Sequence, residues 1–179
     1  MKTLETERLT LTAYKPEDAQ DLFEYASNPD VGPIAGWAPH KDVAESEMII
    51  REMFMPVEAW AIRLKGKDKV IGTIALEYDK YRPESNSREI GYSLAKDQWK
   101  KGYMTEAAKA VIKFAFEELG LDQIGICTGE VNKRSQRVIE KCGFKYEGTI
   151  RRTYKVFDGT CRDSLVFSML KEEYEELYK

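Results

Sequence analysis

The chain has little of the chemistry that metal sites and histidine-based catalysis need. Among 179 residues there is one histidine, His40, and the three cysteines, Cys127, Cys142 and Cys161, are widely separated. A zinc site or a disulfide framework needs cysteines or histidines at short spacing, and a Ser–His triad needs a histidine paired with an acid. We therefore expect no metal site, and cysteines that are small core residues, with a catalytic thiol as the alternative.

Long apolar runs and an excess of basic charge are also missing. No stretch approaches the roughly 20 apolar residues that cross a bilayer, and the segment Met1 to Glu5 has no signal-peptide core. The formal net charge is −3 and the isoelectric point is about 5.5, which argues against a broad nucleic-acid surface. We expect a cytoplasmic protein with no membrane and no nucleic-acid partner.

What the chain does have is typical of a folded domain. Hydrophobic residues make up 42% of it and charged residues 33%, a balance that disordered proteins do not show. The length suits one domain with a core of its own, and no repeat or linker-like run divides it. We therefore predict a single domain over residues 1–179.

Hydrophobic periodicity predicts an alternation of strands and helices. Alternating or continuous apolar residues predict strands over 9–13, 58–64, 70–79, 88–95, 123–128, 144–156 and 162–170. Apolar stripes and capping signals predict helices over 16–26, 42–54, 103–119, 132–142 and 171–179. The order strand, helix, strand over 88–128 indicates a parallel crossover.

The most informative segment joins the strand 88–95 to the helix 103–119. Residues 98–107 read QWKKGYMTEA, so the chain turns through Gly102 directly into the helix. Free N–H groups and the positive end of the helix dipole then point at one spot, which suits a phosphate group. Lys100 and Lys101 add positive charge there. A plain turn is the alternative, because neither common nucleotide-binding glycine motif is present.

Several separate motifs together resemble the GNAT acetyltransferase superfamily. They are the segment 98–107, Asn132-Lys133-Arg134-Ser135 and Glu140-Lys141-Cys142-Gly143-Phe144. Within it, Glu89-Ile90-Gly91-Tyr92, Gly102-Tyr103 with Thr105-Glu106-Ala107, and Asp158 to Asp163 resemble the RimJ/RimL-like branch. Named members of that branch acetylate N-termini of ribosomal proteins, whereas many other members acetylate other amines.

This resemblance covers nearly the whole chain and implies a fold. It is an α+β fold, an α/β/α sandwich with a mixed, mostly antiparallel central sheet of about seven strands and helices on both faces. It also implies an acetyl-CoA-dependent N-acetyltransferase that acts on a primary amine. The acceptor classes are a peptide N-terminus, a polyamine, an amino acid or an aminoglycoside-like amine. A non-catalytic module that senses coenzyme A or docks a partner is the alternative, and relatives are often homodimers.

The resemblance assigns the cofactor contacts residue by residue. The family's pyrophosphate loop, Gln/Arg-x-x-Gly-x-Gly/Ala, corresponds to Trp99, Lys100, Lys101, Gly102, Tyr103 and Met104, followed by Thr105. Trp99 replaces a polar residue, and Met104 replaces a small one. The backbone around Gly91 and Tyr92 is where the family polarises the thioester carbonyl. Asn132 and Ser135 complete the predicted contacts, although both are also good residues for capping a helix.

The catalytic assignments are Glu89 and Ser135. Glu89 matches the position where some relatives carry a general base, acting directly or through water. The alternative is an exposed strand-end glutamate that pairs with Arg88 or another cation. Some relatives use a tyrosine as general acid at the position of Ile139. That role is vacant here, or it passes to Ser135, Tyr103 or a water molecule. Ser135 is thus the candidate for contacting the departing sulfur.

The acceptor site is expected to form from the loop 31–41, the second helix and the final hairpin. Trp37 and His40 are the candidates to line it together with Glu89. Packing of the loop is the alternative role for Trp37, and an ordinary surface position is the alternative for His40.

Overall fold

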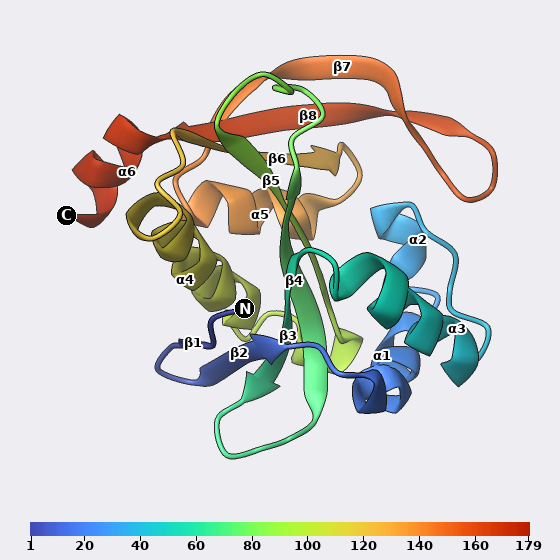
Figure 1. Cartoon of the computed structure of the whole chain (residues 1–179). Helices are drawn as coiled ribbons and strands as arrows, with labels where there is room; N and C mark the ends of the chain where they lie inside the picture. Colours follow the sequence, from blue (N-terminus) through green and yellow to red (C-terminus); the bar gives the residue numbers. More distant parts are fainter.

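One central sheet organises the structure, a computed structural model that describes residues 1–179 (Figure 1). The strand order is β1-β2-β3-β4-β5-β6-β8-β7, and every neighbouring pair is antiparallel except β5 and β6. The strands are β1 (Leu4–Glu5), β2 (Leu9–Ala13), β3 (Glu58–Leu64), β4 (Val70–Tyr78), β5 (Ser87–Leu94), β6 (Gln123–Gly129), β7 (Lys145–Lys155) and β8 (Cys161–Leu170). The predicted mixed sheet is confirmed, with β1 as an eighth strand too short to give an alternating pattern.

Helices cover both faces of this sheet. They are α1 (Ala19–Ala26), α2 (Gly32–Ala35), α3 (Val43–Ile49), α4 (Tyr103–Glu117), α5 (Lys133–Lys141) and α6 (Lys171–Tyr178), with short helical turns η1 (Pro16–Asp18), η2 (Ile50–Phe54) and η3 (Lys96–Gln98). The larger core cluster joins the sheet to α4, α5 and α6, and the smaller one joins it to α1 and η2. Neighbouring residues of β3 divide between them, since Trp60 belongs to the first cluster and Ala61 to the second. None of the helices is both long and apolar enough to cross a membrane.

The pairing of β5 with β6 is the feature that makes room for a site. The connection β5–α4–β6 is the predicted parallel crossover, but the two strands pair only from Ser87–Gln123 to Glu89–Gly125. Beyond this point β5 continues to Leu94 beside β4, and β6 continues to Gly129 beside β8. The backbone groups that β5 and β6 turn toward each other there have no strand partner, so a gap opens in the sheet.

Two local predictions need correction. Residues 31–41 are not a loop throughout, because α2 occupies Gly32–Ala35 and ends at Gly36 with a φ of 103°. The helix predicted over 103–119 ends earlier, because α4 stops at Glu117 and the Leu119 residue beyond it is 37% exposed. The apolar stripe of α4, Ala108, Val111, Ile112 and Ala115, is buried.

The first turn of α4 is fastened to the amino-terminal segment through Glu106. Its carboxylate accepts hydrogen bonds from Thr6 Oγ1 at 2.5 Å and from the Arg8 backbone N–H at 2.8 Å, and it forms an ion pair with Arg8 Nη2 at 2.6 Å. Partial burial favours the neutral acid, but these bonds and the Arg8 charge outweigh it and lower the pKa of Glu106. The carboxylate therefore stabilises the fold where it is ionised.

Replacing Glu106 by Gln is expected to lower the free energy of unfolding by roughly 1–3 kcal/mol at pH 7. Because the folded pKa is below the unfolded one, this contribution is full above the unfolded pKa and is lost as the pH falls through the folded pKa. Urea titrations of both proteins between pH 3 and pH 8 test this. The control is Glu118→Gln, which breaks the exposed ion pair with Lys2 and is expected to cost less than about 1 kcal/mol. Equal effects of the two variants would contradict the prediction.

Candidate active site

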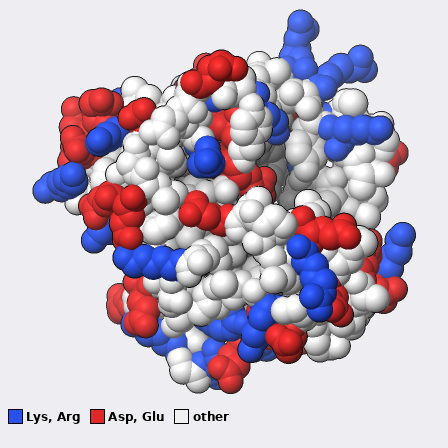
Figure 2. All heavy atoms as spheres, in the orientation of Figure 1, with Lys and Arg blue, Asp and Glu red and all other residues white.

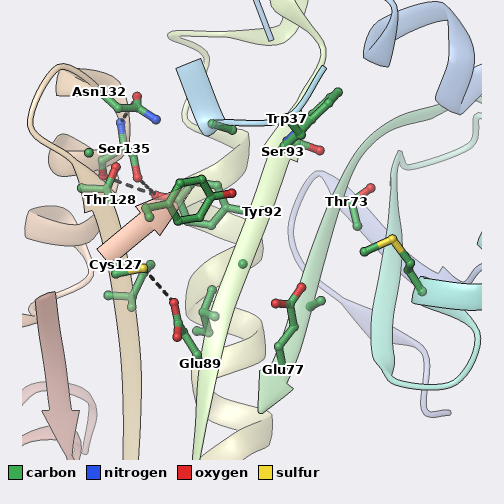
Figure 3. A pocket seen from close by; sticks show the side chains of 18 of the residues that line it. Trp37, Thr73, Glu77, Glu89, Tyr92, Ser93, Cys127, Thr128, Asn132 and Ser135 are labelled. Carbon is green, nitrogen blue, oxygen red and sulfur yellow. Dashed lines mark hydrogen bonds between the residues drawn. The ribbon is translucent and has the colours of Figure 1, made fainter. Parts of the chain in front are cut away.

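A cleft of about 550 Å³ lies where β5 and β6 separate. Its walls come from β4, β5, β6 and β8, from the start of α5, and from the segment that leads into α3 and η2. Figure 2 shows acidic and basic side chains around a hollow near the middle of the face seen in Figure 1, and Figure 3 shows the cleft from close by. Seven of the predicted site residues line it together: Trp37, His40, Glu89, Gly91, Tyr92, Asn132 and Ser135.

The other predicted cofactor residues, Trp99 to Thr105, form the turn into α4 and do not line this cleft. The turn uses left-handed backbone at Lys100, with a φ of 65°, and at Gly102, with a φ of 85°. As a result, the backbone N–H groups of residues 100–105 donate to no acceptor within the protein. The guanidinium of Arg134, beside Ser135 on α5, lies 4.0 Å from the ring centre of Trp99, so the turn adjoins the cleft.

The two departures from the family's loop pattern have structural explanations. Trp99 is half-buried, and its indole N–H donates to the carbonyl of Leu94 at 2.8 Å, which ties the turn to the end of β5. The side chain of Met104 is packed in the larger core cluster with only 6% of the residue exposed. Neither side chain therefore covers the free N–H groups of the turn.

Arg8 holds this turn from a distant part of the sequence. Its guanidinium donates to the carbonyl of Lys101 at 3.0 Å, lies 4.7 Å from the ring centre of Tyr103 and pairs with Glu106. Sequence reasoning missed Arg8, because nothing in a strand-flanking arginine indicates a contact 93 residues away.

Asn132 and Ser135 form a helix cap that also faces the cleft. The Asn132 side-chain oxygen accepts the backbone N–H of Ser135 at 3.2 Å, as a helix cap requires. The Ser135 hydroxyl is therefore free of the cap, and it lies 2.8 Å from the hydroxyl of Tyr92. Burial raises the pKa of Tyr92, so this hydroxyl keeps its proton at neutral pH.

Ile139 occupies the position at which some relatives carry a tyrosine as general acid, so this chain has no hydroxyl there. Ile139 is fully buried in the larger core cluster. Tyr103, one of the alternatives, lies beneath Arg8 and does not line the cleft. The hydroxyl groups of Ser135 and Tyr92 do line the cleft, and they lie 2.8 Å apart at the start of α5.

Glu89 lies on the floor of the cleft and makes a contact that the sequence did not indicate. The thiol of Cys127 on β6 donates to Glu89 Oε1 at 2.8 Å. Burial, together with the Glu89 charge, raises the pKa of Cys127 to about 12, so the donor is a thiol rather than a thiolate. The alternative of an ion pair with Arg88 is wrong, because Arg88 donates to the carbonyl of Ser87 and Glu89 forms no ion pair.

The expectation that all three cysteines are core residues is confirmed only for Cys142. That residue is 1% exposed, whereas Cys161 is exposed and Cys127 lines the cleft. Cys127 is half-buried on β6, and it lines the cleft because the pairing with β5 ends two residues earlier, at Gly125.

Trp37 and His40 form one wall of the cleft. The Trp37 ring packs over Gly32, where a Cβ atom would come within 2.4 Å of it, so the packing role considered for Trp37 is real. The ring of His40 lies 5.3 Å from that of Trp37, and its Nδ1 is 2.8 Å from the hydroxyl of Ser46. Partial burial lowers the pKa of His40, which the charge of Glu45 offsets only in part. His40 is therefore a neutral group at neutral pH.

Arg162 joins the final hairpin to this wall. Its guanidinium donates to the carbonyls of Ile34 at 2.8 Å and Ala35 at 2.7 Å, and it lies 4.7 Å from the ring centre of Tyr154. The loop 31–41, the helix predicted over 42–54 and the final hairpin all contribute residues to one cleft. That this part of the cleft receives the acceptor stays a prediction.

Comparison with known proteins agrees with this architecture. A family profile described as "Acetyltransferase (GNAT) domain" matches residues 8–145. The N-acetyltransferase p20 of Bacillus licheniformis, described as uncharacterized, is 34% identical over 97% of this chain and 99% of its own. YdaF of Bacillus subtilis, whose description proposes a ribosomal N-acetyltransferase, is 31% identical over 94% of both chains and agrees with the RimJ/RimL-like resemblance.

Solved structures give the same result for the fold. A GNAT-family acetyltransferase from Bacillus anthracis superposes with a TM-score of 0.83, covering 96% of this chain and 100% of its own at 24% identity. The acetyltransferase MccE, solved in complex with acetyl-CoA and AMP, has a TM-score of 0.79 at 19% identity, covering 92% and 93%. Because the profile spans most of the chain and p20 is related along its whole length, the chain belongs to the GNAT family of acetyl-CoA-dependent N-acetyltransferases.

Proposed function

We propose that this N-acetyltransferase transfers acetyl to a primary amine, either a protein N-terminus or the amine of a small molecule. One observation carries the proposal: the unpaired N–H groups of residues 100–105 adjoin a cleft whose floor carries a carboxylate without an ion pair, that of Glu89. When bound, acetyl-CoA supplies an acetyl group activated as a thioester. The remaining requirements fall on side chains and backbone groups of this chain.

The turn into α4 binds the diphosphate of the cofactor. The N–H groups of residues 100–105 and the positive end of α4 attract the negative charge. Lys100 and Lys101 are exposed beside them and add charge without fixing geometry. A cleft of about 550 Å³ lies within the range of roughly 300–1,000 Å³ that ligand sites occupy, so the arm that carries the thioester fits between β5 and β6.

The unpaired edge of β5 orients that arm. Backbone groups near Gly91 and Tyr92 face the gap and are free to bond an extended amide chain, as a further strand would. An N–H group directed at the thioester oxygen also stabilises the oxyanion formed on attack, which is worth roughly 3 kcal/mol in known acyl transfers. Asn132 contributes by ordering the start of α5 at the mouth of the gap.

Two groups move protons in this proposal. Glu89 accepts a proton from the attacking nitrogen, directly or through water, because its carboxylate forms no ion pair and lines the cleft. Ser135 donates a proton to the departing sulfur. The Tyr92 hydroxyl, 2.8 Å away, orients the serine and relays a proton to it from water in the cleft. The pair takes the place of the family tyrosine that Ile139 replaces.

The acceptor enters between Trp37, His40 and the final hairpin. Apolar surface from Trp37, Met53 and Phe54 lies near carboxylates in this half of the cleft, a mixture that suits a cationic amine on an apolar carrier. Peptide N-termini, polyamines, amino acids and aminoglycoside-like amines all satisfy this description in part. The description of YdaF adds support for a protein N-terminus.

A non-catalytic coenzyme A sensor is the second candidate. Its support is the buried Ile139 in place of the family's acid. The Tyr92–Ser135 hydroxyl pair argues against it, because a sensor has no need for a proton donor at that place.

Gly102→Ala is expected to weaken coenzyme A binding by about 10-fold. The residue has a φ of 85°, and a side chain in that region costs roughly 1–2 kcal/mol, so the turn relaxes to another shape that the cofactor must reverse. Isothermal titration calorimetry measures the change. Gly66→Ala is the matched control, since Gly66 has a φ of 74° in the exposed β3–β4 turn with open space around it. Equal affinities for the two variants would argue against diphosphate binding at this turn.

Turnover is expected with at least one of a set of primary amines, and Ser135→Ala is expected to lower kcat by about 10²-fold. The set comprises alanyl and seryl tetrapeptides, free amino acids, spermidine and kanamycin, assayed by release of the free thiol. Tyr92→Phe is expected to have a smaller effect, and neither variant should greatly change coenzyme A affinity. Normal cofactor binding without turnover of any acceptor would favour the sensor. A fully active Ser135→Ala variant would remove the serine from the reaction.

A further inference from the structure

A second carboxylate lies beside Glu89 on the neighbouring strand. Glu77 of β4 is the register partner of Glu89 on β5, so both side chains rise from the same face of the sheet. Glu77 Oε1 is 3.2 Å from the position that a Cβ atom on Gly91 would occupy. In Figure 3, Glu89 turns toward Cys127, whereas Glu77 lies on the other side of β5. The two carboxylates therefore flank the backbone at Gly91.

Glu77 has no partner of its own. It forms neither a hydrogen bond to a protein group nor an ion pair, although it lines the cleft and is accessible to solvent. Glu89, in contrast, has one oxygen occupied by the Cys127 thiol. An unpaired carboxylate on a cleft wall is a ready partner for a cation that arrives from outside.

The surroundings of Glu77 favour proton uptake. The pKa of Glu77 is raised, chiefly by reduced contact with water and secondly by the charge of Glu89. The charge of Lys80 lowers this pKa, but by a smaller amount. The other titratable or charged groups that face the cleft are His40 and Glu45 from the α3 side, Tyr92 from β5, Cys127 from β6, and Tyr154 and Arg162 from the hairpin. Of these, Arg162 donates its hydrogen bonds to two carbonyls of α2. Cys127 and Tyr92 are neutral, because their pKa values are raised.

We propose that Glu77 binds the ammonium group of the acceptor and takes its first proton. This inference rests on the proposed function, and it assigns a residue that the motif comparison did not indicate. Most primary amines are protonated at neutral pH, because their pKa values are roughly 8 to 10. A carboxylate in front of Gly91 attracts the ammonium to the place where the thioester carbonyl is expected, and then makes it a nucleophile.

The protons balance with two carboxylates. The ammonium gives its first proton to Glu77, which releases it to solvent through the open cleft. As the nitrogen–carbon bond forms and the carbon–sulfur bond breaks, the nitrogen gives its second proton to Glu89. The sulfur receives one proton from Ser135, and the proton on Glu89 restores that hydroxyl through water. The sum is an acetylated amine, a free thiol and one proton released.

The test is the pH dependence of kcat/KM for Glu77→Gln, measured with the fastest acceptor of the set named above. In the wild-type protein, the Glu77 carboxylate and the ammonium form of the acceptor are both present around neutral pH, so we expect kcat/KM to be independent of pH there, forming a plateau. In Glu77→Gln, only the neutral amine reacts. The expected profile then rises about tenfold per pH unit up to the pKa of the amine, with a loss of about 10²-fold at pH 7 for an amine of pKa near 9.

Two controls separate this role from a structural one. Glu89→Gln is expected to lower kcat but to keep the plateau, since the first proton still leaves through Glu77. Glu84→Gln, in the exposed β4–β5 loop, is expected to change neither. Thermal melting and coenzyme A titration of Glu77→Gln check that the fold and the cofactor site are intact.

Each outcome has a distinct meaning. A wild-type protein without turnover overturns the proposed function and this inference with it. A wild-type protein with turnover whose plateau survives Glu77→Gln overturns the inference alone. A plateau lost in Glu89→Gln but kept in Glu77→Gln assigns the first proton to Glu89 instead.

Discussion

The early end of the β5–β6 pairing is the constraint on which the rest of the site depends. The strands share only the short register from Ser87 to Glu89, after which their facing backbone groups have no partner. In a closed sheet this gap would be a defect, because unpaired N–H and C=O groups are costly when buried. Here it is open to a ligand, and it lets Cys127 of β6 meet Glu89 of β5.

The site also depends on the turn into α4, which must keep its shape while its backbone N–H groups stay free of internal hydrogen bonds. Left-handed backbone at Lys100 and Gly102 leaves consecutive N–H groups free, and such a turn has little hydrogen bonding of its own. Contacts from other segments hold it instead: Arg8 and Glu106 on one side, and Arg134 over Trp99 on the other. The surface that we propose binds the diphosphate is thus made of backbone, while distant side chains fix its geometry.

Local patterns predicted most elements well because each depends on neighbours in the chain. The apolar stripe of α4, the Asn132 cap of α5 and the final hairpin of β7 and β8 are all present. α2 was missed because a partner far along the chain stabilises it, since Arg162 of the hairpin donates to the carbonyls of Ile34 and Ala35. β1 was missed because it has only two residues, which pair with nearby β2. Neither contact leaves a periodic signal in the sequence.

The sequence by itself determined the fold class, since hydrophobic period and capping residues are local properties. Through its motifs it also indicated the family, and it predicted the glycine turn that we propose binds the cofactor. It also indicated Glu89 and Ser135 by position in a motif. Only the tertiary structure decided which groups stand beside them: Cys127 on Glu89, Tyr92 on Ser135, and Glu77 across Gly91. The reason is strand register, which sets the face and the height of every side chain and is itself set by long-range pairing rather than by any one segment.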